Sequence, residues 1–263
     1  CGKEGLLSTP AVSAVIRRRD AGFVPFGGFI LTASHNPGGI DEDFGIKYNC
    51  ENGGPAPEAV TDAIFSKTQS ITRLLSADAF PPIDLEKEGT VEVKGEGRVV
   101  TVEVFDSTVD YLETVRACFD MAALSSFLAR PDVSLAFDAL HGAAGPYARK
   151  VLVEALGAKP DSLLNCTPLP DFGGPACPSH GHADPNLKNA AELCAMMGVD
   201  VAGNATAAKA GAPSIGAAAD GDADRNMILG PGFFVTPSDS LAVLVDNCSC
   251  IPFFKDGIKG AAR

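Results

Sequence analysis

The sequence has no run of apolar residues near the roughly 18 that a membrane-spanning helix needs. Its first 20 residues also lack a basic segment followed by an apolar one. We therefore expect no integral membrane association and no secretion signal in these residues. The sequence begins with Cys1 and not with methionine, so we expect a piece of a longer protein or a processed product.

Metal-binding cysteine patterns are missing as well. The eight cysteines include no C-x-x-C pair, and the close pair Cys248 and Cys250 has no histidine nearby. This argues against a zinc site and favours reduced thiols in a cytoplasmic protein. Basic residues are too few for a general nucleic-acid or membrane-surface binder, because 21 Lys and Arg against 33 Asp and Glu give a net charge of −12. An anionic ligand would need a local cluster of arginine, lysine and metal.

Short apolar segments alternate with helical ones along the chain, whose 263 residues are enough for two domains. Alternation of strands and helices in residues 106–236 predicts a parallel α/β sheet. Residues 1–105 give a first pattern that ends in a β ribbon, and residues 237–263 begin a helix but are too short for a domain. The expected strands are 27–33, 44–49, 133–140, 214–220 and 225–230, and the expected helices are 8–19, 57–75, 145–158 and 190–200.

The segment LTASHNPGG, residues 31–39, joins a serine, a histidine and an asparagine to a Pro-Gly-Gly end. Pro37 ends the preceding apolar strand, and the two glycines supply backbone angles for a tight loop. Ser34 lies on such a loop at the carboxyl end of a buried strand, and this position indicates a catalytic role. The same residue types also make ordinary turns, so the local pattern alone leaves both interpretations open.

A second cluster, DGDADR at 220–225, places three carboxylates at alternate positions directly after a strand. Three acids repel one another unless a cation neutralises them, and oxygen ligands select Mg²⁺ over Zn²⁺. An EF-hand calcium loop is excluded, because its sixth position would be Arg225 and its twelfth Pro231. A solvated acidic turn is the alternative. Arg225 favours a metal site, since a guanidinium beside a cation suits a phosphate that both can hold.

Three further residues are candidates by position. Lys47 follows Ser34 by 13 positions, on a strand that can return beside the serine loop, although a solvated edge lysine fits the pattern too. His35 would point away from Ser34 on a regular strand, but its loop position leaves its direction open. His141 lies between a strand and a helix, where a capping or packing role fits as well as a ligand role.

Taken together, these segments resemble the α-D-phosphohexomutase superfamily, and most of all its eukaryotic phosphoglucomutase branch. The superfamily is marked by TASHNP at 32–37 and by DGDADR. The branch is marked by GLLSTPAVS at 5–13, FGIKYN at 44–49, NGGPAPEA at 52–59, HGAAGPY at 141–147, NMILG at 226–230 and FFVTPSDS at 233–240. The resemblance covers nearly the whole chain. It implies phosphohexomutase-type α/β domains with mixed, mainly parallel sheets flanked by helices.

The resemblance also implies an activity, the interconversion of glucose 1-phosphate and glucose 6-phosphate through glucose 1,6-bisphosphate. By motif, Ser34 would carry the phosphoryl group, and its phosphate oxygen would complete a Mg²⁺ site with the carboxylates. Lys47 would be the general base, and His35 would position the sugar. The phosphate-binding residues would be Arg225 and Asn36, and the metal ligands would be Ser34, Asp220, Asp222 and Asp224. Phosphoryl transfer depends on alignment and charge neutralisation, which such a set supplies.

The chain departs from the family pattern in several places. Ala223 stands where phosphoglucomutases usually have glycine, so either its backbone angles are ordinary or the loop geometry differs. The loop that contains His182 is longer than the family's usual histidine loop. The family's TSGLR, GEESFG and RxSGT segments are absent. We therefore expect a fragment of a four-domain protein: part of domain 1 at 1–105, domain 2 at 106–236, and the start of domain 3 at 237–263. Alone it should be a poor mutase.

Two other functions fit the motifs. Parafusin-like members of the branch are associated with membrane fusion and secretion, which would make the chain a regulated phosphoprotein or scaffold. Retention of Ser34, Lys47 and the three aspartates favours the enzyme, because a scaffold does not need the metal set. A sibling mutase for phosphomannose or N-acetylglucosamine phosphate would keep SHNP and DGDADR. In each enzymatic interpretation the expected partner is a hexose phosphate.

Overall fold

A computed structural model describes residues 1–18, 24–95 and 97–261 of the chain. The α-helices are α1 (Thr9–Arg17), α2 (Glu58–Thr68), α3 (Ser107–Cys118), α4 (Met121–Leu128), α5 (Ala144–Ala148), α6 (Ala191–Met197) and α7 (Pro237–Asp246). The strands are β1 (Gly27–Thr32), β2 (Gly45–Cys50), β3 (Gly89–Gly95), β4 (Arg98–Val104), β5 (Leu135–Asp138), β6 (Leu163–Leu164), β7 (Ile215–Ala219), β8 (Asn226–Gly230) and β9 (Phe233–Val235). A π-helix continues α5 over Arg149–Ala155, and 3-10 turns occupy Lys3–Gly5, Pro160–Ser162, Cys248–Cys250 and Pro252–Phe254.

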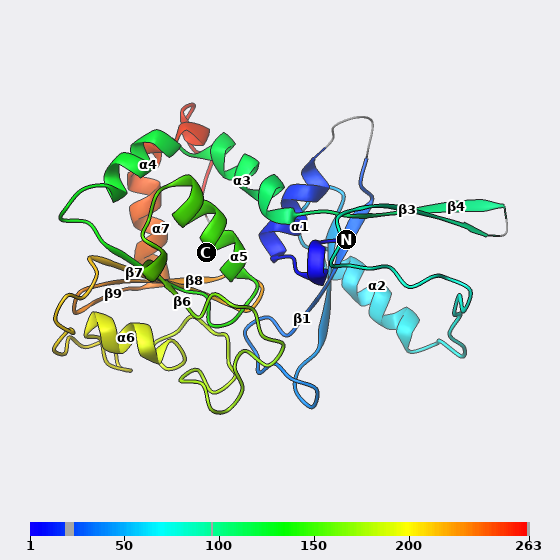
Figure 1. The fold of residues 1–263 in the computed structure, drawn as a ribbon, viewed down its shortest axis with the longest axis horizontal. Helices are drawn as coiled ribbons and strands as arrows, with labels where there is room; N and C mark the ends of the chain where they lie inside the picture. Colours follow the sequence, from blue (N-terminus) through cyan, green and yellow to red (C-terminus); the bar gives the residue numbers. More distant parts are fainter. Residues whose placement is uncertain (19–23, 96, 262–263) are drawn as a thin grey trace.

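The elements form two bodies that lie side by side (Figure 1). One holds α1, α2, the hairpin β1–β2 and the protruding ribbon β3–β4, and the other holds a five-stranded sheet with helices on both of its sides. Figure 1 shows α6 on one side of this sheet, and α3, α4 and α5 on the other. No helix in the part of the chain that the structure describes is both long enough and apolar enough to cross a membrane.

The five-stranded sheet has the order β6-β5-β7-β8-β9 and is mixed. Strand β5 pairs in parallel with β6 and β7, whereas β7 with β8 and β8 with β9 are antiparallel. The mixed α/β sheet flanked by helices that the resemblance implied is confirmed, but its described strand pairs are parallel and antiparallel in equal number and not mainly parallel. The reason is the connection Asp220–Arg225, because a parallel return needs a crossover of about a dozen residues or more. With so short a loop, β8 must run back beside β7.

The main core lies where α6 covers the sheet. Leu193 and Met197 on α6 are fully buried, and Met227 and Leu229 of β8 are 3% and 1% exposed. After Ile215 the strand β7 consists of glycine and alanine, which lets the helix approach closely. This packing fixes the carboxyl end of β7, where the acidic loop begins.

Helix α1 packs against β1 and is capped by Ser8, the first residue of the expected range 8–19; Ser8 Oγ accepts a hydrogen bond from the backbone N of Ala11 at 3.2 Å. Pro10 is the second helical residue. The helix ends at Arg17, and position 19 of its predicted range lies outside the described residues, as do positions 262–263 of the predicted third segment.

The amphipathic helix expected over 57–75 is shorter in the structure, since α2 ends at Thr68 and buries none of its residues. Helices in proteins depend on burying an apolar face, and Phe65 on this one is 64% exposed. The hairpin beside it also exposes apolar side chains, with Phe29 72% and Ile46 65% exposed, so the prediction that the strand before Ser34 is buried is wrong. The helix expected over 145–158 is divided into α5 and the π-helix.

Candidate functional site

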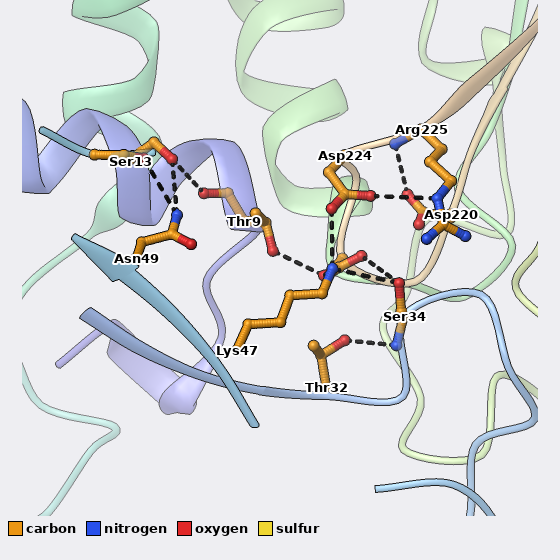
Figure 2. A network of polar contacts seen from close by, with 11 residues as sticks. Thr9, Ser13, Thr32, Ser34, Lys47, Asn49, Asp220, Asp224 and Arg225 are labelled. Carbon is orange, nitrogen blue, oxygen red and sulfur yellow. Dashed lines mark hydrogen bonds and ion pairs between the residues drawn. The ribbon is translucent and has the colours of Figure 1, made fainter. Parts of the chain in front are cut away.

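The serine loop follows β1 directly and holds Ser34 in an unusual backbone conformation. Ser34 has φ 58°, in the left-handed region that residues other than glycine rarely adopt. Its backbone N donates a hydrogen bond to Thr32 Oγ1 at 2.7 Å, and the N of Asn36 donates to Ala33 O at 3.1 Å. These bonds stabilise a tight turn that points the serine hydroxyl at the second body (Figure 2).

The acidic loop connects β7 to β8 and brings its three carboxylates together. Asp220 and Asp222 are 0% and 2% exposed, and ligand atoms of Asp220, Asp222 and Asp224 all lie within 4.8 Å of one another. The Oδ1 of Asp220 accepts a bond from the backbone N of Arg225 at 2.9 Å. Its Oδ2 is buried and has no hydrogen-bond partner in the described part of the chain. A solvated acidic turn does not describe this arrangement, because two of the acids are buried.

Close backbone packing brings the two loops together. A Cβ on Gly221 would collide with the Ser34 carbonyl oxygen, so this approach requires glycine. On the other flank, a Cβ on Gly38 would lie 2.8 Å from Phe172 Cδ2, and the Gly38 N donates to Gly181 O at 3.2 Å. The serine loop is therefore held between the acidic loop and the loop that contains Phe172.

Lys47 joins the serine to the acids. It lies on β2 opposite Ile30 of β1, and its Nζ donates to Asp222 Oδ2 at 2.5 Å, to Asp224 Oδ2 at 2.9 Å and to Ser34 Oγ at 3.3 Å. The serine hydroxyl in turn lies 3.5 Å from Asp222 Oδ1. Figure 2 shows these side chains converging from three segments of the chain. Lys47 is not a solvated edge residue.

The charges of the cluster shift one another's pKa values. Burial, followed by the like charges of Asp222 and Asp224, raises the pKa of Asp220 to about 7. Burial also acts to raise the pKa of Asp222, but hydrogen bonds from Lys47 and Thr9 and the Lys47 charge outweigh it and lower that pKa. For Lys47, burial acts to lower the pKa, and the bonds and charges of Asp222 and Asp224 overcome it and raise the pKa. Lys47 is thus held as an ammonium.

The other predicted site residues surround this centre. Arg225 is half exposed, with Nε 3.9 Å from Asp224 Oδ1. His35 is half-buried, and its Nδ1 is a buried atom without a hydrogen-bond partner among the described residues. His141 does not join the polar cluster, and its Nδ1 lies 2.9 Å from Thr167 O. His182 makes a β-bridge to Pro37 and so contacts the serine loop through its backbone.

Sequence reasoning missed Thr9, whose Oγ1 donates to Asp222 Oδ2 at 2.8 Å. The segment STP that contains it was assigned only to the expected helix 8–19 and to the GLLSTPAVS mark of the resemblance. The sequence also left open whether Ala223 has ordinary backbone angles or whether the loop geometry is altered. The structure gives Ala223 φ 62°, so this alanine adopts the left-handed conformation. That conformation costs an L-residue about 1–2 kcal/mol.

A cleft of about 660 Å³ lies beside the centre, between the two bodies. It is lined from one side by Thr32 and Phe44, and from the other by His141, Phe172 and Asp222. Its volume is in the range of sites for small molecules. The arrangement therefore offers a hydroxyl, an ammonium and a buried acid cluster at the edge of a cleft.

Comparisons with known proteins match both bodies. The description "Phosphoglucomutase/phosphomannomutase, alpha/beta/alpha domain I" matches residues 2–74, and that of domain II matches residues 109–232. The chain is 52% identical over 265 residues to a cytoplasmic phosphoglucomutase of Populus tremula and 51% identical to that of Solanum tuberosum; each alignment covers 100% of this chain and 44% of the relative.

A solved structure is similar over the same extent. It is the Paramecium protein titled exocytosis-sensitive phosphoprotein, pp63/parafusin (phosphoglucomutase), in its open form. The TM-score is 0.86 at 44% identity, and the match covers 100% of this chain and 45% of that one. The chain thus spans somewhat less than half the length of these relatives.

Proposed function

Because the chain belongs to the phosphoglucomutase/phosphomannomutase family, we propose that it carries the phosphoryl-transfer centre of a phosphoglucomutase. The reaction is the interconversion of glucose 1-phosphate and glucose 6-phosphate through glucose 1,6-bisphosphate, with Ser34 as the phosphoryl carrier. One observation carries the proposal: Ser34 Oγ lies 3.3 Å from Lys47 Nζ and 3.5 Å from a buried carboxylate. A serine in an ordinary turn has no need of such partners.

The acidic loop fits a magnesium ion. Its donors are all oxygens, the Asp220 Oδ2 is buried without a partner among the described residues, and the pKa of Asp220 is raised to about 7 by burial and by its acidic neighbours. We propose Asp220, Asp222, Asp224 and a phosphate oxygen on Ser34 as the ligands. When bound, Mg²⁺ would neutralise negative charge on the transferring phosphoryl group.

Lys47 is placed to move a proton at Ser34 Oγ. When the sugar hydroxyl oxygen bonds to phosphorus, its proton passes to water, the Ser34 Oγ–P bond breaks, and the ammonium gives its proton to the departing Oγ. In the reverse step, the neutral amine takes the proton of Ser34 Oγ as that oxygen attacks the sugar phosphate, and the departing sugar oxygen takes a proton from water. Lys47 is therefore the general base when Ser34 attacks and the general acid when it leaves. The 3.3 Å between Nζ and Oγ supports this assignment.

Arg225, Asn36 and His35 complete the proposed site at its edge. The half-exposed guanidinium of Arg225 can donate two hydrogen bonds to one phosphate, since its contact with Asp224 is 3.9 Å long. His35 and Asn36 follow the carrier serine and would contact the sugar and its phosphate. We assign the residues to part of domain 1 (1–105), domain 2 (106–236) and the start of domain 3 (237–263); the two family matches lie within the first two parts.

Glucose phosphates and a cytoplasmic compartment are proposed because the plant relatives are named cytoplasmic phosphoglucomutases. The Paramecium title names both a phosphoprotein and a phosphoglucomutase, so a role in secretion would not replace the enzyme. A scaffold alone is less favoured, because it would not require Lys47 beside Ser34 and the buried acids.

Phosphoryl transfer to the serine tests the proposal directly. The chain is incubated with Mg²⁺ and glucose 1,6-bisphosphate labelled in its phosphates, and the labelled residue is mapped. We expect label on Ser34, none in Ser34→Ala, and normal labelling in Ser70→Ala, which alters an exposed serine whose hydroxyl donates to Lys67 O. Label that persists in Ser34→Ala, or no label in the wild-type chain, would contradict the assignment. Turnover of glucose 1-phosphate, measured alongside, is expected to be slow.

A further inference from the structure

Asp222 is held at both its backbone and its side chain by one residue of the other body. Thr9, the first residue of α1, donates from its backbone N to Asp222 O at 2.8 Å and from its Oγ1 to Asp222 Oδ2 at 2.8 Å. The two residues lie 213 positions apart. Figure 2 shows the hydroxyl of Thr9 directed at the place where the side chains of Lys47 and Ser34 also meet.

The side-chain bond matters because nothing intrinsic fixes the rotation of a carboxylate. The last torsion of an aspartate is broad, so the plane of its carboxylate can turn. Here Oδ2 accepts from Thr9 and Lys47, and Oδ1 faces Ser34 Oγ at 3.5 Å. The Thr9 hydroxyl thus fixes the plane in which one oxygen meets the lysine and the other meets the serine.

A second chain of bonds connects Thr9 to the strand that carries Lys47. The carbonyl oxygen of Thr9 accepts from Ser13 Oγ at 3.2 Å, and Ser13 Oγ accepts from Asn49 Nδ2 at 3.1 Å. Asn49 is 2% exposed and stands two residues after Lys47, on the same face of β2. The first turn of α1 therefore anchors both the acid and the strand of the lysine.

Helix capping does not account for the Thr9 hydroxyl. The cap of α1 is Ser8, whose Oγ accepts from the Ala11 N at 3.2 Å. A hydroxyl at the first helical position that donates to a buried aspartate of another segment adds nothing to that cap. Its effect falls on the aspartate.

We propose that Thr9 is a positioning residue, which holds the Asp222 carboxylate with Oδ2 toward Lys47 and Oδ1 toward Ser34 and so aligns serine, lysine and metal ligand for phosphoryl transfer. The inference rests on the proposed function, and it assigns residues 8–10 a structural role in phosphoryl transfer. Residues that orient a metal ligand typically change metal affinity or activity by about 10- to 100-fold when they are removed.

The test compares Thr9→Val, which keeps the shape and removes the hydroxyl, with Thr9→Ser, which keeps the hydroxyl. Thr108→Val is the matched control, because Thr108 Oγ1 donates to Asp106 Oδ1 at 2.7 Å near the start of α3, away from the site. Mg²⁺ affinity is measured by calorimetry, and the rate of Ser34 labelling from glucose 1,6-bisphosphate is measured in single-turnover experiments. Thermal unfolding monitors the fold of each variant.

We expect Thr9→Val to lower the labelling rate and the Mg²⁺ affinity by about tenfold or more, while Thr9→Ser and Thr108→Val stay near wild type. If Thr9→Val labels and binds Mg²⁺ as Thr108→Val does, the inference is wrong and the proposed function stands. If the wild-type chain neither binds Mg²⁺ nor takes label, the proposed function fails and the inference with it. If Thr9→Val does not fold, the labelling rate and Mg²⁺ affinity of Thr9→Ala are compared with those of Thr9→Ser, and the same outcomes apply.

Discussion

Asp220 should destabilise the chain at neutral and alkaline pH when no cation is bound, and its replacement by asparagine should therefore stabilise the fold. The carboxyl is 0% exposed, and its pKa is raised from 3.8 to about 7 by burial and by Asp222 and Asp224. Folding therefore favours its protonated form. Each pKa unit corresponds to about 1.4 kcal/mol, which makes the cost on the order of 4 kcal/mol above pH 7. This cost vanishes below about pH 4, where the unfolded chain is protonated as well.

Asparagine has the same shape and no charge, and its amide oxygen can still accept from the backbone N of Arg225. In EDTA at pH 8, we expect Asp220→Asn to unfold at higher urea than wild type, with a difference of up to about 4 kcal/mol that shrinks as the pH falls toward 4. Added Mg²⁺ should stabilise the wild-type chain and have little effect on the variant. A variant less stable than wild type at pH 8 in EDTA would refute the reasoning. Asp138→Asn, which alters a buried carboxyl outside the cluster, should keep the Mg²⁺ response.

Three further predictions concern the same loops. Ala223→Gly should raise the free energy of unfolding by about 1 kcal/mol in urea titrations, because glycine adopts φ 62° without the strain of a Cβ. Lys47→Met should slow Ser34 labelling by about 10²- to 10⁴-fold, as for loss of a proton-transfer group, whereas Lys67→Met on the exposed α2 should not. Gly221→Ala should push the serine loop off the acidic loop, lowering stability by about 1–3 kcal/mol and reducing Mg²⁺ binding in calorimetry; normal binding would show that the loops tolerate separation.

Much of the candidate site could be predicted from the sequence, because most of its residues lie in short contiguous motifs. Ser34 and the three aspartates lie in short motifs on loops after apolar strands, and both the strands and the loops are where the pattern placed them. Lys47 required one step more, the return of a second strand beside the first, which its spacing from Ser34 suggested.

Other features depend on contacts between distant segments, which no local pattern reveals. The role of Thr9 depends on a residue 213 positions away, and a threonine at a helix start is indistinguishable by pattern from a cap. The amphipathic spacing of 57–75 predicted a longer helix, but α2 has nothing to bury its apolar side against in the described residues and ends at Thr68. The direction of β8 followed from the length of the acidic loop, a feature that the alternation of strands and helices does not encode.

The separation of the site's parts along the chain has a kinetic consequence. Ser34 and Asp222 are 188 positions apart and belong to different bodies, so their contact closes one of the longest loops in the molecule. Contacts of such sequence separation form late, after local hairpins and helices. During refolding, each body should regain its secondary structure before the cluster of serine, lysine and acids assembles. The capacity of Ser34 to take a phosphoryl label would then appear last, and its recovery would time the docking of the two bodies.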